Sequence, residues 1–276
     1  MQLSEIFIYP VKSLRGVSLN SAKVESRGLA YDRRWMIVAD GGETFFTQRE
    51  FPEMALLTTE LTDNHLIIRH SSKTLEALQI PLEMPKNGAS LLVRIWDDTC
   101  QAITVSPKAD AWLSEALGTP CQLVYMPDDS RRATDPKYSQ DGDIVSFADG
   151  YPFLVIGQTS LDDLNKRLPE PVGIERFRPN FVFTGGAAYE EDHWKQFTIG
   201  NLNFRGVKKC ARCQLTTVNP ETGKFGKEPL RTLGQYRLEG HKILFGMNAI
   251  WDINNKIEPI IKIGDQINVL ASTDTP

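Results

Sequence analysis

Two of the chain's four cysteines form a Cys-x-x-Cys pair, Cys210 and Cys213, in a strongly basic segment. Lys208 and Lys209 come directly before the pair, and Arg212 lies inside it. Positive charge stabilises a thiolate relative to a thiol, and the thiolate is the form that attacks electrophiles and binds soft metals. The pattern therefore predicts a metal-ligand site or a redox site at this segment.

The pair alone is compatible with half of a structural zinc site, a thioredoxin-type dithiol, one metal ligand beside a bystander, or two thiols without a task. A zinc site lacks further ligands, because Cys100 and Cys121 are far apart in sequence and none of the four histidines has zinc-finger spacing. A dithiol normally opens a helix, whereas the β-branched run 216–218 predicts that the thiols come just before an extended strand.

Two basic segments in the first forty residues suit an anionic ligand. The segment 9–16 reads as a strand end and a loop that presents Lys12, Ser13 and free backbone N–H groups, which is chemistry suited to an oxyanion. Arg33 and Arg34 precede the next strand, and strand alternation predicts that one faces a cleft while the other stays in solvent. Solvated surface charge is the commoner outcome for each segment taken alone.

A third basic segment places Arg178 and Asn180 two residues apart at the start of a strand, hence on one side of it. Arginine contacts to an anion and asparagine contacts to a heterocycle would suit a pterin or a nucleotide. The irregular stretch 127–142 also carries several charges, and it is either a mobile functional loop or a solvated charged linker.

Composition and length fit an ordinary soluble protein of one large or two modest domains: 276 residues, 41% apolar and 24% charged. The net charge of −4 argues against bulk binding to nucleic acid or to an anionic membrane. The first ten residues lack the pattern of a signal peptide, and no apolar run approaches the roughly 18 residues of a membrane span. We therefore expect a cytoplasmic protein with reduced cysteines.

The elements that position these residues are expected to be mainly strands. Short strands bounded by turn residues are predicted at 3–9, 18–26, 35–39, 66–69, 91–95, 101–105, 122–125, 181–184, 197–199 and 202–208. Helices are predicted at 108–117, ended by Gly118, and at 160–167, capped by Ser160. Strands without regularly alternating helices favour a mainly β, barrel-like (α+β) architecture with small helical insertions over a doubly wound sheet.

Together, four motifs resemble the MOSC protein family, most closely its YcbX branch and the mitochondrial amidoxime-reducing component. The similarity covers nearly the whole chain and extends to the segment 263–265. The motifs, in chain order, are Tyr9-Pro10-Val11-Lys12-Ser13, Asp32-Arg33-Arg34-Trp35, Phe177-Arg178-Pro179-Asn180 and Cys210-Ala211-Arg212-Cys213-Gln214-Leu215-Thr216-Thr217-Val218.

This resemblance implies an N-terminal MOSC-associated β domain at 1–95 and a MOSC-type (pyruvate-kinase-like) β-barrel at 96–276, with a molybdenum cofactor (molybdopterin) held between them. In the family the second cysteine of the motif ligates molybdenum, and that position matches Cys213 here. Asp149 matches a family acid near the metal, so Cys213 and Asp149 are the expected catalytic residues. The expected cofactor-contacting positions are Lys12, Ser13, Arg33, Arg178, Asn180 and Arg212.

The activity implied by the resemblance is reduction of N-hydroxylated compounds, including hydroxylamines, N-hydroxylated bases and amidoximes, with oxygen leaving as water. Longer YcbX proteins carry a plant-type ferredoxin domain with clustered cysteines that this sequence lacks, so the expected electron donor is a separate ferredoxin, flavodoxin or reductase. The alternatives are a non-catalytic carrier of the cofactor or of persulfide sulfur, and a binding module for small phosphorylated heterocycles.

Overall fold

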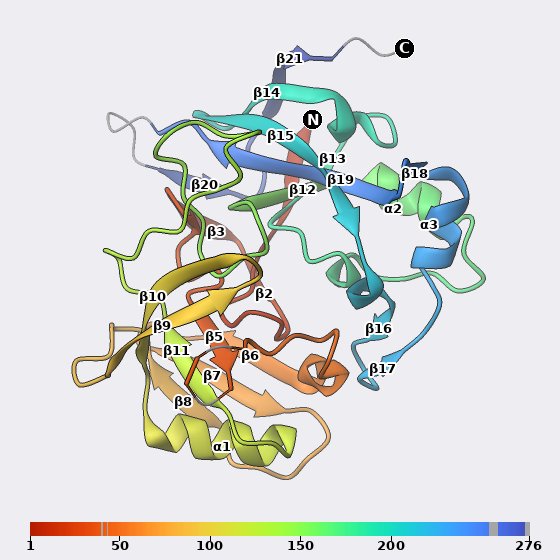
Figure 1. The fold of residues 1–276 in the computed structure, drawn as a ribbon. Helices are drawn as coiled ribbons and strands as arrows, with labels where there is room; N and C mark the ends of the chain where they lie inside the picture. The colour runs from red at the N-terminus through yellow and green to blue at the C-terminus, as the bar shows by residue number, and fades with distance from the viewer. Residues whose placement is uncertain (40, 43, 254–258, 274–276) are drawn as a thin grey trace.

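Strands dominate the structure, a computed structural model that describes residues 1–39, 41–42, 44–253 and 259–273 (Figure 1). The α-helices of these residues are short: α1 (Pro107–Leu117), α2 (Gln158–Asn165) and α3 (Leu230–Tyr236). In the part of the chain that the structure describes, no helix is long and apolar enough to cross a membrane. The mainly β fold class with small helical insertions is confirmed.

One large sheet forms the upper half of the molecule in Figure 1. Most neighbours in it are antiparallel, but β12 and β13 are parallel. Its strands in spatial order are β2 (Val17–Leu19), β1 (Gln2–Ile8), β13 (Phe181–Thr184), β12 (Phe153–Gly157), β19 (Lys242–Trp251), β15 (Leu202–Arg212), β14 (Trp194–Ile199) and β21 (Ile267–Ser272), with β18 (Leu238–Glu239) beside β19. The first strand of the chain is therefore paired with a strand from its second half, β13.

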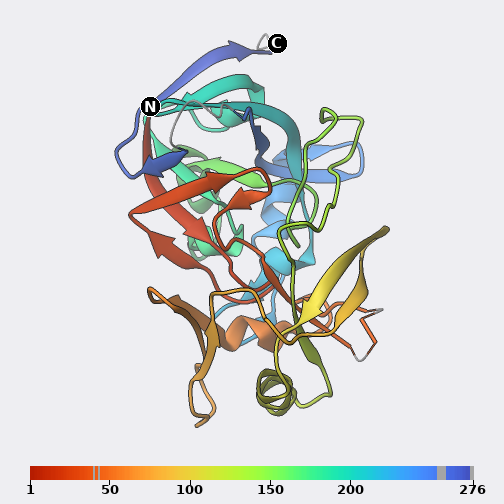
Figure 2. The same ribbon diagram turned by 90° about the vertical axis from the view of Figure 1, so that its left-hand side faces the viewer.

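A second group of strands forms the lower half of the molecule, where α1 packs beside it (Figures 1 and 2). A four-stranded sheet has the order β5 (Trp35–Val38), β11 (Gln122–Tyr125), β10 (Asp98–Thr104) and β9 (Ser90–Ile95). A three-stranded sheet has the order β6 (Leu57–Leu61), β7 (His65–His70) and β8 (Leu78–Pro81). Each half buries its own apolar core.

Short elements complete the fold. A small sheet has the order β20 (Ile260–Lys262), β3 (Ser21–Glu25) and β4 (Gly28–Leu29), and a ribbon pairs β16 (Val218–Asn219) with β17 (Lys224–Phe225). The 3-10 helices are Pro52–Leu56, Ile174–Arg176, Glu190–His193 and Gln214–Thr217. The division proposed between residues 95 and 96 stays a prediction; β9 and β10, on either side of it, pair as a hairpin.

Two local predictions were wrong. The chain after Cys213 is a 3-10 helix rather than an extended strand, because the hydroxyl of Thr216 donates to the Cys213 carbonyl at 3.0 Å and that of Thr217 to the Gln214 carbonyl at 2.8 Å. Ser160 does not cap α2, which begins at Gln158. The prediction of the other helix is confirmed: Ser106 caps α1, and Gly118 ends it with a φ of 70°.

Candidate functional site

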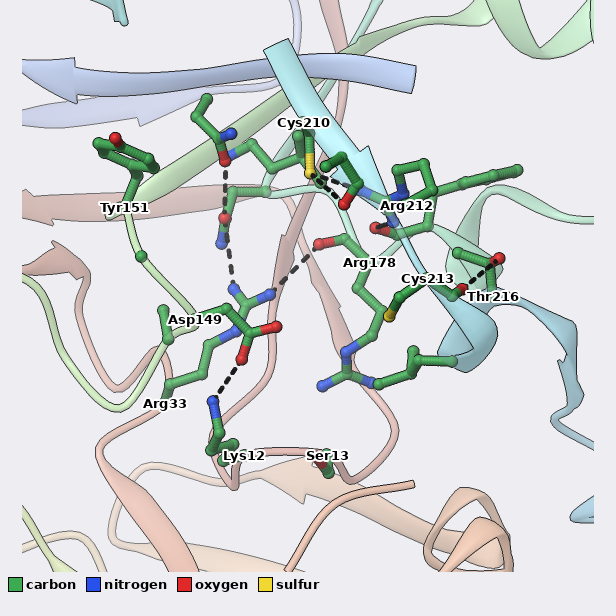
Figure 3. Close-up of a pocket in the computed structure, with 18 of the residues that line it drawn as sticks. Lys12, Ser13, Arg33, Asp149, Tyr151, Arg178, Cys210, Arg212, Cys213 and Thr216 are labelled. Atoms are coloured by element: carbon green, nitrogen blue, oxygen red, sulfur yellow. Dashed lines mark hydrogen bonds and ion pairs between the residues drawn. The ribbon is translucent and has the colours of Figure 1, made fainter. Parts of the chain in front are cut away.

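The predicted site residues converge on one pocket of about 130 Å³ where the two halves of the molecule meet. Lys12 and Ser13 enter it from the loop after β1, whereas Cys210 and Cys213 enter it from the end of β15 (Figure 3). The predicted residues that line the pocket are Lys12, Ser13, Arg33, Asp149, Arg178, Asn180, Cys210, Arg212 and Cys213. Segments far apart in sequence thus build a single cavity.

Three of the lining residues have left-handed backbone conformations. The φ angles are 67° at Ser13, 49° at Arg33 and 58° at Arg178. This region costs a non-glycine residue free energy, and such residues concentrate at functional sites, where the surrounding fold must hold them. Arg33 and Arg178 also precede their strands, so their directions come from these turns and not from strand alternation.

Buried Asp32 ties the basic segments together. Its carboxylate accepts hydrogen bonds from the Tyr9 backbone N–H at 2.7 Å, from Arg33 at 2.6 Å and from the Asn180 amide at 3.1 Å. Arg33 in turn donates to the Arg178 carbonyl at 3.2 Å. Asp32 is therefore a positioning residue to which sequence reasoning assigned no role, although it belongs to one of the four motifs.

Lys12 and Asp149 form an ion pair at the pocket floor, with 2.6 Å between Nζ and Oδ1 (Figure 3). Burial lowers the pKa of Lys12 to about 8, although Asp149 acts in the opposite direction. Desolvation acts against ionisation of Asp149, but Lys12 and Arg49 hold its pKa well below the usual range. Asp149 is therefore a carboxylate at neutral pH, and 58% of its side chain is open to the pocket.

Arg49 is a charged lining residue that the sequence did not point to. Its Nε donates to the Cys213 sulfur at 3.2 Å, and its terminal nitrogen lies 3.3 Å from Asp149 Oδ2. Despite desolvation, these two partners raise the pKa of Arg49 above its usual value. A guanidinium donor is complementary to a sulfur that carries negative charge. No local sequence pattern identified Arg49, because it reaches the thiol from 164 positions away.

The basic residues around the cysteine pair divide into two groups. Arg212 donates to the Cys210 sulfur at 2.9 Å, so this cation does reach a thiol of the pair. The expectation for the two lysines was wrong: Lys208 lies over the Tyr138 ring at 4.6 Å, and Lys209 pairs with Glu239 at 2.5 Å. The charges of both lysines therefore interact with these other side chains and not with the thiols.

Arg33 and Arg34 do separate as predicted, but Arg34 is buried and not in solvent. Its guanidinium donates to the Tyr125 hydroxyl at 3.0 Å and pairs with Asp128 at 2.5 Å. The last residue of β11 and the segment after it supply these acceptors, and the backbone carbonyl of Met126 accepts a further bond at 2.7 Å.

The stretch 127–142 is not simply a solvated linker. Arg132 is buried, and its guanidinium donates to the backbone carbonyls of Ser146 and Asp149, both at 3.0 Å. It also pairs with Asp98 at 2.8 Å. The stretch therefore stabilises the backbone that carries Asp149, a residue that lines the pocket.

Cys100 and Cys121 lie away from the pocket, buried in two different apolar clusters. Burial raises the pKa of both thiols, so they are protonated and inert at neutral pH. Among the residues that the structure describes, no group of three or more His, Cys, Asp or Glu side chains could hold a metal ion. Of the four thiols, only those of Cys210 and Cys213 line the pocket.

The residues of the pocket fit an anionic ligand that carries a soft metal. Five cationic side chains face one carboxylate, and burial beside Arg33 lowers the pKa of Arg178 to about 10. The Nε of Arg212 is buried without a hydrogen-bond partner among the described residues, so one donor is free for a ligand. A neighbouring cavity of about 340 Å³ shares Arg178 and Leu215 with the pocket and adds room.

Comparison with known proteins adds the family. Residues 1–120 match the MOSC N-terminal beta barrel domain, and residues 142–268 match the MOSC domain. Mitochondrial amidoxime-reducing component 1 of Mus musculus is 32% identical over 98% of this chain and 82% of its own length. Mitochondrial amidoxime reducing component 2 of Bos taurus is 32% identical over 96% of this chain and 82% of its length.

A second group of relatives carries a different name. The molybdenum cofactor sulfurase of Solanum lycopersicum is 33% identical over 96% of this chain, but the match spans 35% of that protein. The two domain matches and the near full-length similarity lead to one conclusion. This chain belongs to the MOSC family, and it joins a MOSC N-terminal beta barrel domain to a MOSC domain.

Proposed function

We propose that the protein is a molybdenum-cofactor-binding oxidoreductase that reduces N-hydroxylated compounds, with electrons from a separate redox partner. The observation that carries this proposal is the position of Cys213, a thiol in a pocket lined by five cations. The name amidoxime-reducing component supports the reduction, and the name molybdenum cofactor sulfurase supports the link to the cofactor. The sulfur of Cys213 is the proposed molybdenum ligand, because thiolate is a donor suited to a soft metal centre.

The other predicted residues would hold the organic part of the cofactor. Arg178 and Arg212 carry donors suited to its phosphate and heterocycle. Asn180 lines the pocket, but its amide is engaged with Asp32 and Phe7, so it also fixes the wall. The full proposed set of cofactor-binding residues is Lys12, Ser13, Arg33, Arg178, Asn180 and Arg212.

When bound, the molybdenum cofactor supplies the two-electron reduction in which R–NH–OH, two electrons and two protons give R–NH2 and water. Asp149 is ionised, so it accepts a hydrogen bond from the substrate and orients it. Lys12, with a pKa of about 8, keeps a proton beside this carboxylate at neutral pH. Arg49 holds Asp149 and the Cys213 sulfur on one guanidinium, which fixes the distance between the two groups.

A separate donor must supply the electrons in this proposal. Of the four cysteines, the two outside the pocket are buried in different clusters, so they form no redox cluster with each other. The donor is proposed to be a ferredoxin, a flavodoxin or a reductase. The purified protein is then expected to reduce a hydroxylamine with reduced viologen but not with NADPH alone.

Metal analysis of protein produced in a host that makes the cofactor tests the proposal directly. About one molybdenum per chain, together with viologen-driven reduction of an amidoxime, is the expected result. Metal-free protein with sulfane sulfur on Cys210 or Cys213 would replace the proposal with a persulfide carrier, the alternative that the sulfurase relatives favour. Turnover with NADPH and no added partner would contradict the separate donor.

A further inference from the structure

A second, aromatic pocket of about 310 Å³ lies beside the cysteine pocket. Phe45, Trp96, Arg94 and Thr47 line it, and Arg49 is common to both cavities. Arg49 thus faces the aromatic pocket while it contacts Cys213 and Asp149 on its other side. The Arg49 guanidinium therefore lies between a ligand in the aromatic pocket and the proposed reaction centre.

Phe45 and Trp96 form the wall of the aromatic pocket. Their ring centroids are 4.9 Å apart with the planes at 82°, an edge-to-face arrangement. The Arg49 guanidinium carbon lies 4.7 Å from the Trp96 centroid, and Lys12 Nζ lies 5.2 Å from the Phe45 centroid. The aromatic pair therefore packs against the two cations that hold Asp149, so it is part of the same rigid assembly.

Trp96 is unusual in its exposure and in its backbone. It is 41% exposed, whereas Trp35 and Trp194 are each 1% exposed in the cores. It lies in the turn between β9 and β10 with a φ of 55°, a region that costs a bulky residue free energy. Arg94 donates to the Trp96 carbonyl at 3.0 Å and fixes the turn. The fold thus holds a large apolar ring open to solvent at the edge of the site.

We propose that the aromatic pocket binds a planar, uncharged aryl group of the N-hydroxylated substrate, which packs on Trp96. This inference rests on the proposed function, because it names the substrate class of the same site. An aryl ring gains dispersion and edge or face contacts with Phe45 and Trp96. Two cations, Arg49 and Arg94, and one carboxylate, Glu50, line the pocket, so its net positive charge disfavours a cationic group there. A substrate seated in this way directs its N–O group past Arg49 toward Asp149 and Cys213.

Binding measured without turnover tests the proposal. The molybdenum-loaded protein, without reductant, is titrated with benzamidoxime and with acetamidoxime in a calorimeter. In Trp96→Ala the affinity for benzamidoxime is expected to fall by about 2- to 12-fold, the range of one aromatic contact. The affinity for acetamidoxime, which has a methyl group in place of the aryl ring, should fall much less. Trp96→Phe should restore most of the lost affinity for benzamidoxime.

The matched control is Leu92→Ala, on the same hairpin, because Leu92 is exposed and lines neither pocket. It should bind both amidoximes like the wild-type protein. Equal losses for both compounds in Trp96→Ala, or an unchanged affinity for benzamidoxime, would overturn the aryl site, as would wild-type protein that binds benzamidoxime no better than acetamidoxime. Selective binding of benzamidoxime without reduction of either compound would contradict the proposed function but still support the aryl site.

Discussion

Cys213 and Cys210 differ in their surroundings, although they are only three residues apart. Cys213 contacts Arg49, which also reaches Asp149, whereas Cys210 contacts Arg212. Only the first thiol is therefore linked to the carboxylate through a shared cation. The two cysteines are expected to have unequal roles for that reason.

Replacement of the two thiols measures this inequality. Cys213→Ser is expected to abolish reduction of N-hydroxylated substrates while the protein stays folded, because a hydroxyl is a poor substitute for a soft thiolate at molybdenum. Cys210→Ser should retain a substantial part of the activity. Circular dichroism, molybdenum content and viologen-driven turnover are measured on both variants. Equal losses in two folded proteins would instead indicate a working dithiol.

Lys12 and Arg178 should matter more for cofactor retention than for chemistry. Lys12→Ala and Arg178→Ala are each expected to lower the molybdenum content several-fold, while turnover per bound molybdenum falls less, because their proposed contacts are to anions. Occupancy is measured by metal analysis of purified protein. Exposed Lys86→Ala, outside the pocket, is the control. Full occupancy with lost activity would contradict the binding assignment.

The sequence predicted the pocket through residues whose chemistry is visible locally. Lys12, Arg178 and Cys213 stand in motifs that combine polar groups with turn or strand signals, and the structure brings them together. The sequence did not indicate a role for Arg49, because its partners Cys213 and Asp149 lie 164 and 100 positions away. The sequence suggested no role for Asp32, because its role depends on three hydrogen-bond donors that only the folded structure brings to its carboxylate.

At the scale of elements, exposure alone did not decide which strands were found: fully buried β5 was predicted, whereas half-exposed β8 and β21 were missed. β12 has all five residues buried, so it shows no alternation of apolar and polar residues, and the sequence analysis missed it. β19 was also missed, because Gly246 with a φ of 84° interrupts its apolar run. Both strands lie in the middle of the large sheet, where neighbours on each side determine the structure more than local pattern does.

A buried carboxylate of the 3-10 helix Glu190–His193, next to the start of α2, makes stability depend on pH. Glu191 is fully buried and accepts hydrogen bonds from the Gly157 backbone N–H at 3.1 Å and from the Ser160 hydroxyl at 2.9 Å. Burial nevertheless raises the pKa of Glu191 to about 7 from its ordinary value of 4.5. The folded protein therefore binds this proton more tightly than the unfolded chain does.

The sign of the effect follows from linkage. The contribution of protonated Glu191 is complete below pH 4.5 and is lost as pH rises through about 7, so the free energy of unfolding should fall by about 3 kcal/mol over that interval. Glu191→Gln should remove this part of the pH dependence and stabilise the protein at pH 8 relative to wild type. Urea unfolding at pH 5 and pH 8 measures both. Exposed Glu115→Gln, in α1, should leave the difference between the two pH values unchanged.

For the whole molecule, the net charge is −4, but lysines gather on one face. Lys195, Lys208 and Lys242 line one shallow cavity over β14, β15 and β19, and β15 leads from there to the cysteine pair. An acidic electron donor that docks on this face would be steered by these charges, and salt would screen the steering. The face therefore replaces the loop of buried Lys12 as the expected docking region.

Salt and charge reversal test that docking region. Turnover driven by an acidic ferredoxin is expected to fall several-fold between low and physiological salt, and Lys195→Glu with Lys242→Glu should raise the KM for the ferredoxin. Viologen-driven turnover should respond to neither change, because viologen needs no docking surface. A double variant with an unaltered KM for the ferredoxin would place the docking region elsewhere.

The pairing of β1 with β13 means that the N-terminal strand is a structural part of the sheet made by the second half of the chain. A fragment that starts at residue 96 would leave the edge of β13 without its partner, and an unpaired edge strand promotes self-association. Size-exclusion chromatography should then show aggregates of that fragment, and a peptide of residues 1–19 added in trans should reduce them. The protein is thus a candidate for split-reporter design, in which strand complementation restores the sheet.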